Sequence, residues 1–445
     1  MLAPDILDYY RGWLEYRCWY QRVPGVQVCV REDGRIRLSA AIGVADEPAA
    51  TPLTEQHRFR IASHSKTFTA VLLLQLAEQG RLRLDDTVGQ HLPELAGAST
   101  GAITVRELLG HGGGVIRDSE DGDFWQLVRP YPDEAQLLEI AGAAGAAVLA
   151  RNERFKYSNI GFGLLGLIIE RVTGSSFAAT ARQQVVDPLE LAATGAEPDP
   201  DERARLAAGH SALSYARQRT VIDHVDTRAL AAATGFYATA ADLTAFYTAL
   251  LPGNNAVLGD DSQRQLRQRQ WPVKAGQSGY GLGVFLNQVG EHELFGHSGG
   301  YPGHITRTFA CPQRRIVASV LTNAIDGPAE PLAEALFRML ELATAAEHRP
   351  AADPARFTGR FHSLWGVLDV AALDGRLFAL NPAAASPVDD AVALEVVDEQ
   401  TLKMVSGPGG ASIGEYMRFE FDADGSIRSV RGTSGMTSRP FQLPA

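Results

Sequence analysis

The order of strand-like and helical patterns along the chain is the feature that most restricts its fold. Residues 26–30 and 36–42 alternate as strands around Asp33-Gly34, a pair that readily adopts the positive φ angles of a tight hairpin turn. A mostly helical block then extends to residue 251, and strand patterns return between residues 281 and 321. Strands that come from both sides of a helical insertion predict an α+β fold: an antiparallel sheet flanked by helices, with an all-helical lobe on one side.

Individual elements of this first part can be bounded from their periodicity. Helices are expected at 5–21, 67–79, 160–173, 176–187, 240–251 and 329–344, and later strands at 281–288, 293–297, 305–309 and 316–321. Together they predict one large domain over residues 1–345.

The last part of the chain has a different pattern. Residues 346–356 have the composition of a linker, and over residues 357–445 the helical signal disappears. Short alternating segments follow, separated by turn pairs such as Asp374-Gly375 and Asp424-Gly425. This pattern predicts a second, small domain: an antiparallel β-barrel or sandwich.

Composition excludes several classes of function. The formal net charge of −11 argues against a nucleic-acid partner, because little here would neutralise a phosphate backbone. No apolar run reaches the roughly 18 residues of a membrane span, and the N-terminal residues lack the apolar core of a signal peptide, which predicts a cytoplasmic protein without a membrane partner. The three cysteines are odd in number and show no metal-like spacing, so we expect neither disulfides nor a metal or cofactor site.

Ser63-His64-Ser65-Lys66 is the only Ser-x-x-Lys in the chain. It follows a short strand-like segment and opens an apolar helix, so the two side chains share one helix face. Burial lowers the pKa of a lysine and lets it act as a base toward a serine hydroxyl. The alternative is a helix-capping serine followed by a solvated lysine, and it is the better interpretation of the motif taken alone.

Tyr157-Ser158-Asn159 is the only Tyr-x-Asn, at the entrance of a predicted helix. A phenolate stabilised by a nearby lysine can carry a proton to a leaving group, and Asn159 can accept from Lys66 and donate to a substrate carbonyl. The alternative is a core tyrosine followed by a helix cap.

His297-Ser298-Gly299 lies on a predicted strand and continues into Gly300. An imidazole there can hydrogen-bond Tyr157, and the glycines allow the backbone to approach a substrate. His111-Gly112-Gly113 matches the same weak pattern, but His111 ends a predicted helix, so His297 is preferred.

Ser-x-x-Lys, Tyr-x-Asn and a strand-borne His-x-Gly, in this order, resemble the penicillin-binding-protein and class C β-lactamase superfamily of serine hydrolases. Further matching segments are 59–63, 103–109, 155–166, 187–189, 234–243 and 280–283. The resemblance covers most of residues 20–345 and implies a β-lactamase-like domain followed by a lipocalin-like barrel.

The resemblance also implies roles for the matched residues. Ser63 is the nucleophile that becomes acylated, Lys66 and Tyr157 exchange its proton, and His297 belongs to the catalytic set. The oxyanion hole falls on the backbone N–H groups of Ser63 and Gly300, next to Gly299. His-Ser-Gly in place of Lys-Thr-Gly is similar to D-stereospecific peptidases, amidases and esterases rather than to efficient β-lactamases.

Two enzymes with an acyl-serine intermediate remain open. One is a penicillin-binding-protein-type thioesterase, which takes a nonribosomal peptide from a carrier-protein thioester and cyclises it head to tail. The other is a cytoplasmic hydrolase of D-amino-acid peptides, amides or esters. A β-lactamase, a DD-carboxypeptidase or a non-catalytic sensor fits less well. Weaker site candidates are Arg439, Arg117-Asp118, Trp125, His304 and Arg307.

Overall fold

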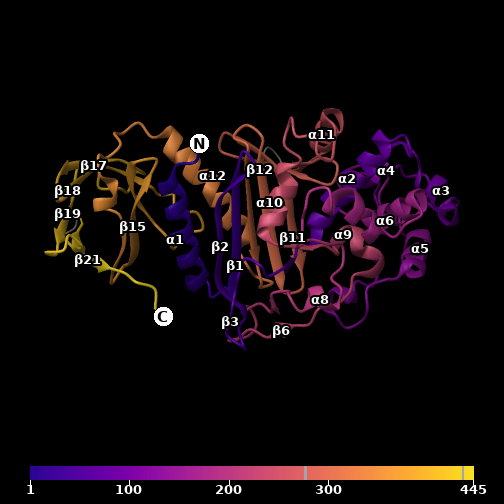
Figure 1. Ribbon diagram of the computed structural model, residues 1–445, viewed down its shortest axis with the longest axis horizontal. Coiled ribbons are helices and arrows are strands. Elements are labelled where there is room, and N and C mark those ends of the chain that lie inside the picture. Colours follow the sequence, from indigo (N-terminus) through magenta and orange to yellow (C-terminus); the bar gives the residue numbers. More distant parts are fainter. Residues whose placement is uncertain (275–277, 433–434, 445) are drawn as a thin grey trace. The chain divides into compact units, whose positions relative to one another are not determined.

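The computed structural model describes residues 1–274, 278–432 and 435–444 (Figure 1). The chain divides into two compact units. Unit 1 comprises Met1–Val23, Val289–Glu291 and Pro331–Ala445, and unit 2 comprises Pro24–Gln288 and His292–Glu330.

Unit 2 is built on a nine-stranded sheet in the order β3-β2-β1-β13-β12-β11-β10-β9-β8. Its strands are β1 (Gly25–Glu32), β2 (Arg35–Asp46), β3 (Thr51–Pro52), β8 (Trp271–Lys274), β9 (Ser278–Tyr280), β10 (Phe285–Val289), β11 (His292–Tyr301), β12 (His304–Cys311) and β13 (Ile316–Thr322). The first strand pairs antiparallel with β2 and with β13, which lies on the far side of the helical block in sequence. The predicted α+β class and the antiparallel sheet are confirmed.

The predicted hairpin turn is also confirmed. Asp33 and Gly34 have φ angles of 50° and 77°, the left-handed pair that a two-residue hairpin turn requires. Glycine tolerates this conformation without cost, and Asp is among the few other residues that adopt it readily.

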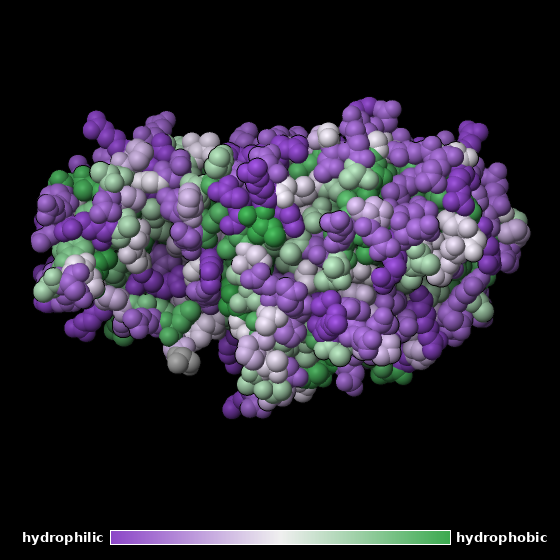
Figure 2. Space-filling model, viewed as in Figure 1, coloured by the Kyte–Doolittle hydropathy of each residue, from purple (hydrophilic) through white to green (hydrophobic). Residues whose placement is uncertain are grey.

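The helical lobe is covered by polar side chains on the face shown in Figure 2, while its apolar residues form one continuous core. Its helices are α2 (Ser65–Glu78), α3 (Val88–His91), α4 (Val105–Leu109), α5 (Glu134–Gly142), α6 (Asn159–Thr173), α7 (Phe177–Ala181), α8 (Pro200–Arg203), α9 (Ala231–Thr234), α10 (Ala240–Thr248) and α11 (Asp260–Arg267). The short pairs β4 (Phe59–Arg60) with β7 (Tyr237–Ala238), and β5 (Gly209–His210) with β6 (Val221–Ile222), complete the unit. Residues 65–74 of α2 are all buried, so this helix runs through the core, and α10 packs on β1 and β13.

Several predicted strands are longer in the structure, as in β11, whereas three predicted elements are shortened or interrupted. The helix expected at 176–187 ends as α7 and continues as a single π-helical turn, and the one expected at 240–251 is three residues shorter. The strand expected at 281–288 begins only at Phe285. Gly283 has a φ of 71°, and a Cβ there would meet the Lys66 carbonyl oxygen at 2.7 Å, so this segment turns to receive α2.

Unit 1 contains a closed eight-stranded barrel in sequence order from β14 to β21. Its strands are β14 (Gly359–Ser363), β15 (Gly366–Leu373), β16 (Arg376–Leu380), β17 (Val392–Asp398), β18 (Thr401–Ser406), β19 (Tyr416–Phe421), β20 (Ile427–Arg431) and β21 (Thr437–Pro440). A closed barrel removes the unpaired edges that a small sheet otherwise exposes. The predicted β-barrel is present, whereas its likeness to lipocalins stays a prediction.

Helix α1 (Pro4–Tyr20) and most of α12 (Ala329–Ala345) belong to unit 1, so the compact units differ from a division at residue 345. The Asp5 carboxylate accepts hydrogen bonds from the backbone N–H groups of Asp374 and Gly375, at the β15–β16 turn. The Trp13 indole N–H donates to the Pro382 carbonyl at 3.1 Å. These bonds attach α1 to the barrel.

Within the described ranges, no single helix is long and apolar enough to span a membrane. One pair, Asn159–Thr173 with Phe177–Val186, reaches the required length only jointly, across a 78° bend.

Candidate active site

Ser63 lies on a tight connection between β4 and α2. A 3-10 turn, Ala62–His64, joins them, so Ser63 precedes the helix rather than opening it. Ala62 has a φ of 47°, a left-handed conformation that is strained for a residue with a Cβ. Such strain is found where a fold must present one side chain, and here that side chain is Ser63.

Ser63 Oγ has two predicted partners at hydrogen-bonding distance. Lys66 Nζ lies 3.2 Å away, and the Tyr157 hydroxyl donates to Oγ at 2.9 Å. Lys66 is completely buried and also donates to Asn159 Oδ1 and to the Ala233 carbonyl, both at 2.8 Å. The structure therefore brings together four of the sequence-predicted site residues.

The surroundings of Lys66 suit an uncharged amine. Burial lowers the pKa of Lys66 well below its usual range, although Asp118 acts in the opposite direction. A neutral amine has two N–H donors and one lone pair. Asn159 and Ala233 accept the two donors, which leaves the lone pair for the Ser63 hydroxyl.

Tyr157 is held as a neutral phenol rather than as the expected phenolate. Burial raises the pKa of Tyr157 above the ordinary tyrosine value, more than Ser63 and Arg117 lower it. The Lys66 Nζ lies 4.8 Å from the centre of its ring. Its hydroxyl is thus a proton donor toward Ser63.

Asn159 links Lys66 to a carboxylate. Its side-chain Nδ2 donates to Asp118 Oδ1 at 2.7 Å, and the same oxygen accepts the Trp125 indole N–H at 2.8 Å. The other Asp118 oxygen pairs with Arg117 Nε at 3.3 Å. The amide of Asn159 is therefore fixed in orientation, with Oδ1 toward Lys66, as predicted.

A cavity of about 460 Å³ opens beside Ser63. Its polar lining comes from Ser63, Tyr157, Asn159 and the Arg117–Asp118 pair, and its aromatic lining from Trp125, Phe155 and Phe285. The weaker candidates Arg117, Asp118 and Trp125 therefore do line the site, whereas His304 and Arg307 are buried residues outside its lining.

Strand β11 supplies the wall opposite the nucleophile turn. Ser298 and Gly300 line the cavity, and Gly299 lies between them. A Cβ on Gly299 would meet the Ile61 carbonyl oxygen at 2.2 Å, so only glycine allows this strand to approach the Ser63 turn. The oxyanion hole of Ser63 and Gly300 N–H groups stays a prediction that this approach supports.

His297 makes other hydrogen bonds than the one expected with Tyr157. Its Nδ1 lies 2.6 Å from the Ser298 carbonyl, which only accepts, so Nδ1 carries the proton and Nε2 accepts from the Tyr280 hydroxyl at 3.1 Å. Burial lowers the pKa of His297, so the ring is neutral. Both nitrogens are therefore engaged, one with the β11 backbone and the other with Tyr280, and neither with Tyr157.

Sequence reasoning missed the groups outside the cavity lining that contact Tyr157, Lys66 and His297. The rejected His111, the second His-x-Gly match, lies with its ring 4.3 Å from that of Tyr157. Tyr280 stood in the matching segment 280–283 without an assigned role, and the Ala233 carbonyl had no signal. Arg439 is exposed on β21 of unit 1 and stays a prediction.

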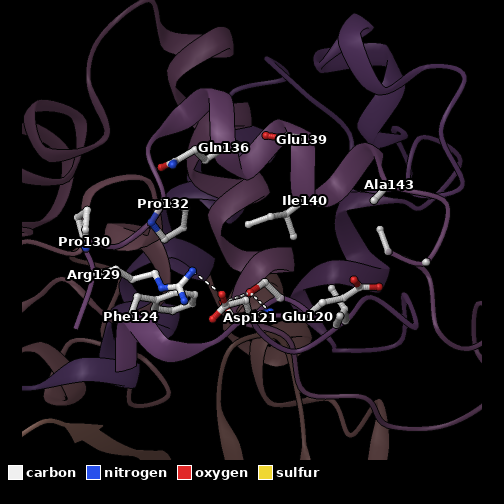
Figure 3. A pocket seen from close by; sticks show the side chains of 14 residues that line it. Glu120, Asp121, Phe124, Arg129, Pro130, Pro132, Gln136, Glu139, Ile140 and Ala143 are labelled. Carbon is white, nitrogen blue, oxygen red and sulfur yellow. Dashed lines mark hydrogen bonds and ion pairs between the residues drawn. The ribbon is translucent and has the colours of Figure 1, made fainter. Parts of the chain in front are cut away.

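A second cavity, of about 470 Å³, lies between α5 and the loop that follows Ile116 (Figure 3). Glu120, Asp121 and Glu139 line it, with an Arg129–Asp121 ion pair at its rim. Its lining residues do not include Ser63 or Tyr157, which line the first cavity.

Comparisons with known proteins agree with this geometry. The chain is 28% identical to penicillin-binding protein 4 of Amycolatopsis lactamdurans over 350 residues, covering 75% of this chain and 89% of that protein. A D-stereospecific amidohydrolase from Streptomyces sp. has a similar structure, with a TM-score of 0.62 and 28% identity, covering 72% of this chain and 94% of that one.

Protein flp of Staphylococcus aureus is 29% identical over 203 residues, which are 44% of this chain and 38% of that protein, so the match spans well under half of that relative. The beta-lactamase family profile matches residues 14–343, a range that holds Ser63, Lys66, Tyr157 and the β11 wall. With that match over most of its length and a serine, lysine and tyrosine in contact within it, the chain belongs to the beta-lactamase family.

Proposed function

We propose that this protein is a serine acyl-transfer enzyme that forms an acyl-Ser63 intermediate with a peptide-like substrate whose acyl residue is D-configured. One observation carries the proposal: Ser63 Oγ, at a cavity wall, lies 3.2 Å from a buried lysine amine and 2.9 Å from a tyrosine hydroxyl. Activated nucleophiles need such a base within hydrogen-bond reach.

In the first step, Lys66 Nζ accepts the Ser63 proton as Oγ bonds to the substrate carbonyl carbon. The backbone N–H groups of Ser63 and Gly300 stabilise the resulting oxyanion, and each such donor contributes about 3 kcal/mol. The Tyr157 hydroxyl then protonates the departing amine or thiolate and regains a proton from Lys66. The carbon–heteroatom bond breaks and the acyl-serine remains.

In the second step, water or an amine attacks the ester, and the same groups act in reverse. D-configuration is supported by the likeness to the D-stereospecific amidohydrolase, which also favours water as acceptor. Cyclisation of a carrier-bound nonribosomal peptide uses the same intermediate with an intramolecular amine, in the cytoplasm where such carriers occur.

The test is incubation with a peptidyl thioester that ends in a D-residue, beside its L-epimer and a Ser63→Ala control, followed by mass spectrometry of protein and product. If the D-epimer yields the linear acid, the protein is a hydrolase. If it yields a product one water lighter than that acid, the protein is a cyclase. If Ser63→Ala turned over like the wild type, the proposal would be wrong.

A further inference from the structure

His111 has a left-handed backbone conformation. It follows α4, is 2% exposed, and has a φ of 59°. This conformation is uncommon for residues with a Cβ, although histidine adopts it more often than most of them. At a buried position it is kept by the contacts that it allows.

Those contacts are hydrogen bonds on both sides of Tyr157. The His111 carbonyl accepts the Lys156 N–H at 2.8 Å, and His111 Nδ1 accepts the Ser158 N–H at 3.2 Å. The left-handed φ lets the His111 carbonyl and the His111 ring both face the segment 156–158. The backbone N–H groups of Lys156 and Ser158, the two residues that flank Tyr157, are thereby fixed.

The imidazole also sets the position of the phenol ring. Its centroid lies 4.3 Å from that of Tyr157 on one side and 4.8 Å from that of Tyr280 on the other. The hydroxyl of Tyr157 sits at the end of this packed ring, 2.9 Å from Ser63 Oγ. A rotation of the ring would break that contact.

We infer that His111 is a positioning residue, which holds Tyr157 and Asn159 toward Ser63 and Lys66 through its Nδ1 acceptor and its ring. The inference rests on the proposed function and deepens it, because His111 is outside the cavity lining and bonds neither Ser63 nor Lys66. It acts as a neutral ring, since Nδ1 accepts a backbone N–H.

The experiment measures how fast a fluorophosphonate probe labels Ser63, by intact mass, in wild type, His111→Gly, His111→Asn and Ser63→Ala. Glycine keeps the left-handed backbone without an acceptor, whereas Asn Oδ1 lies near the position of Nδ1 and also tolerates this backbone. Asn152→Gly is the matched control: Asn152 is also left-handed, at 58°, and its N–H donates to Gly112.

We expect labelling about 100-fold slower in His111→Gly, because a misplaced catalytic group costs that much, and His111→Asn within about tenfold of wild type. Asn152→Gly should label normally, and the pH profile of His111→Asn should keep the wild-type shape. If the glycine variant does not fold, His111→Gln, whose acceptor lies one carbon farther, replaces it with the same expectation.

Three results would each overturn the inference: labelling of His111→Gly at the wild-type rate, an equal loss of labelling rate in His111→Gly and His111→Asn, or a limb of the pH profile that disappears in His111→Asn. A wild type that the probe leaves unlabelled would instead contradict the proposed function. The two failures are therefore distinguishable.

Discussion

Each unit buries an ionisable side chain, but only one of the two has an oppositely charged partner. In unit 1, Asp369 is 2% exposed and accepts hydrogen bonds at 2.8 and 2.9 Å from Arg360, which faces it across β14 and β15. In unit 2, Lys66 is also buried, but among the described side chains no carboxylate bonds it, and Asp118 reaches it only through Asn159.

The difference distinguishes a buried group that stabilises the fold from one that is suited to catalysis. A buried ion that is paired keeps its charge and holds neighbouring elements together, whereas a buried amine without a paired carboxylate gives up its proton. Arg360 also donates to the Gly12 carbonyl of α1, so its pair with Asp369 stabilises that junction. Lys66 instead lies 3.2 Å from Ser63 Oγ with a lowered pKa, and its proposed role as a base rests on this arrangement.

Replacing Lys66 should have the largest effect. Lys66→Met keeps the volume but removes the proton acceptor, so labelling of Ser63 by a fluorophosphonate should slow by about 10³- to 10⁴-fold. Intact mass against time gives the rate, and a thermal melt reports folding. Lys403→Met, the same change on the barrel, is the control, and a Lys66→Met protein that labels normally would contradict the base assignment.

Breaking the pair in unit 1 should act on stability instead. Asp369→Ala leaves Arg360 unpaired and should lower the free energy of unfolding by about 3–5 kcal/mol, measured by urea denaturation. The double change Asp369→Leu with Arg360→Met should restore most of it, since no uncompensated charge remains. Asp390→Ala, at an exposed carboxylate, should change it by less than about 0.5 kcal/mol. Equal losses in single and double variants would refute the pairing argument.

Acidification should reduce acylation by protonating Lys66. Because the folded pKa of Lys66 is lowered, the amine is neutral above that value and the rate falls as the pH drops through it. Asp118→Asn removes the carboxylate that raises this pKa, so the acidic limb should move to lower pH, with the optimum rate within about tenfold of wild type. The control Asp121→Asn should leave the acidic limb in place. If Asp118→Asn also left it in place, an electrostatic effect of Asp118 on Lys66 would be excluded.

The smallest effect is expected from Arg117, whose charge lowers the pKa of Lys66. Arg117→Gln should move the acidic limb to higher pH, opposite to Asp118→Asn. Its side chain is 62% exposed, so the difference from wild type should vanish near 1 M salt, where the Debye length is about 3 Å. A shift that persists at high salt would indicate that Arg117 acts through contact rather than through its field.

The residues of the proposed catalytic set were predictable because their relation is local or carried by a distinctive pair. Ser63 and Lys66 are one turn apart, and Tyr157 with Asn159 stands at a helix entrance, where the Ser158 hydroxyl accepts the Gly161 N–H. Strand alternation and turn pairs likewise predicted the sheet and the barrel.

The two histidines could not be told apart in this way. Both His111 and His297 precede small residues, and placement on a strand favoured His297. Which ring faces Tyr157 depends instead on one left-handed φ and on the orientation of a strand residue, and both are set by tertiary packing. For the same reason, no periodicity showed that α1 belongs with the barrel, because that attachment consists of hydrogen bonds and ring contacts between residues far apart in the sequence.

The bonds between α1 and the barrel also affect the order in which the two units can fold during synthesis. Unit 1 takes its first helix from the start of the chain, yet its barrel closes only when β21 pairs with β14. Unit 2 is complete in sequence by residue 330. During synthesis, α1 therefore emerges long before the barrel strands that it contacts, whereas all residues of unit 2 have been made once the chain reaches residue 330.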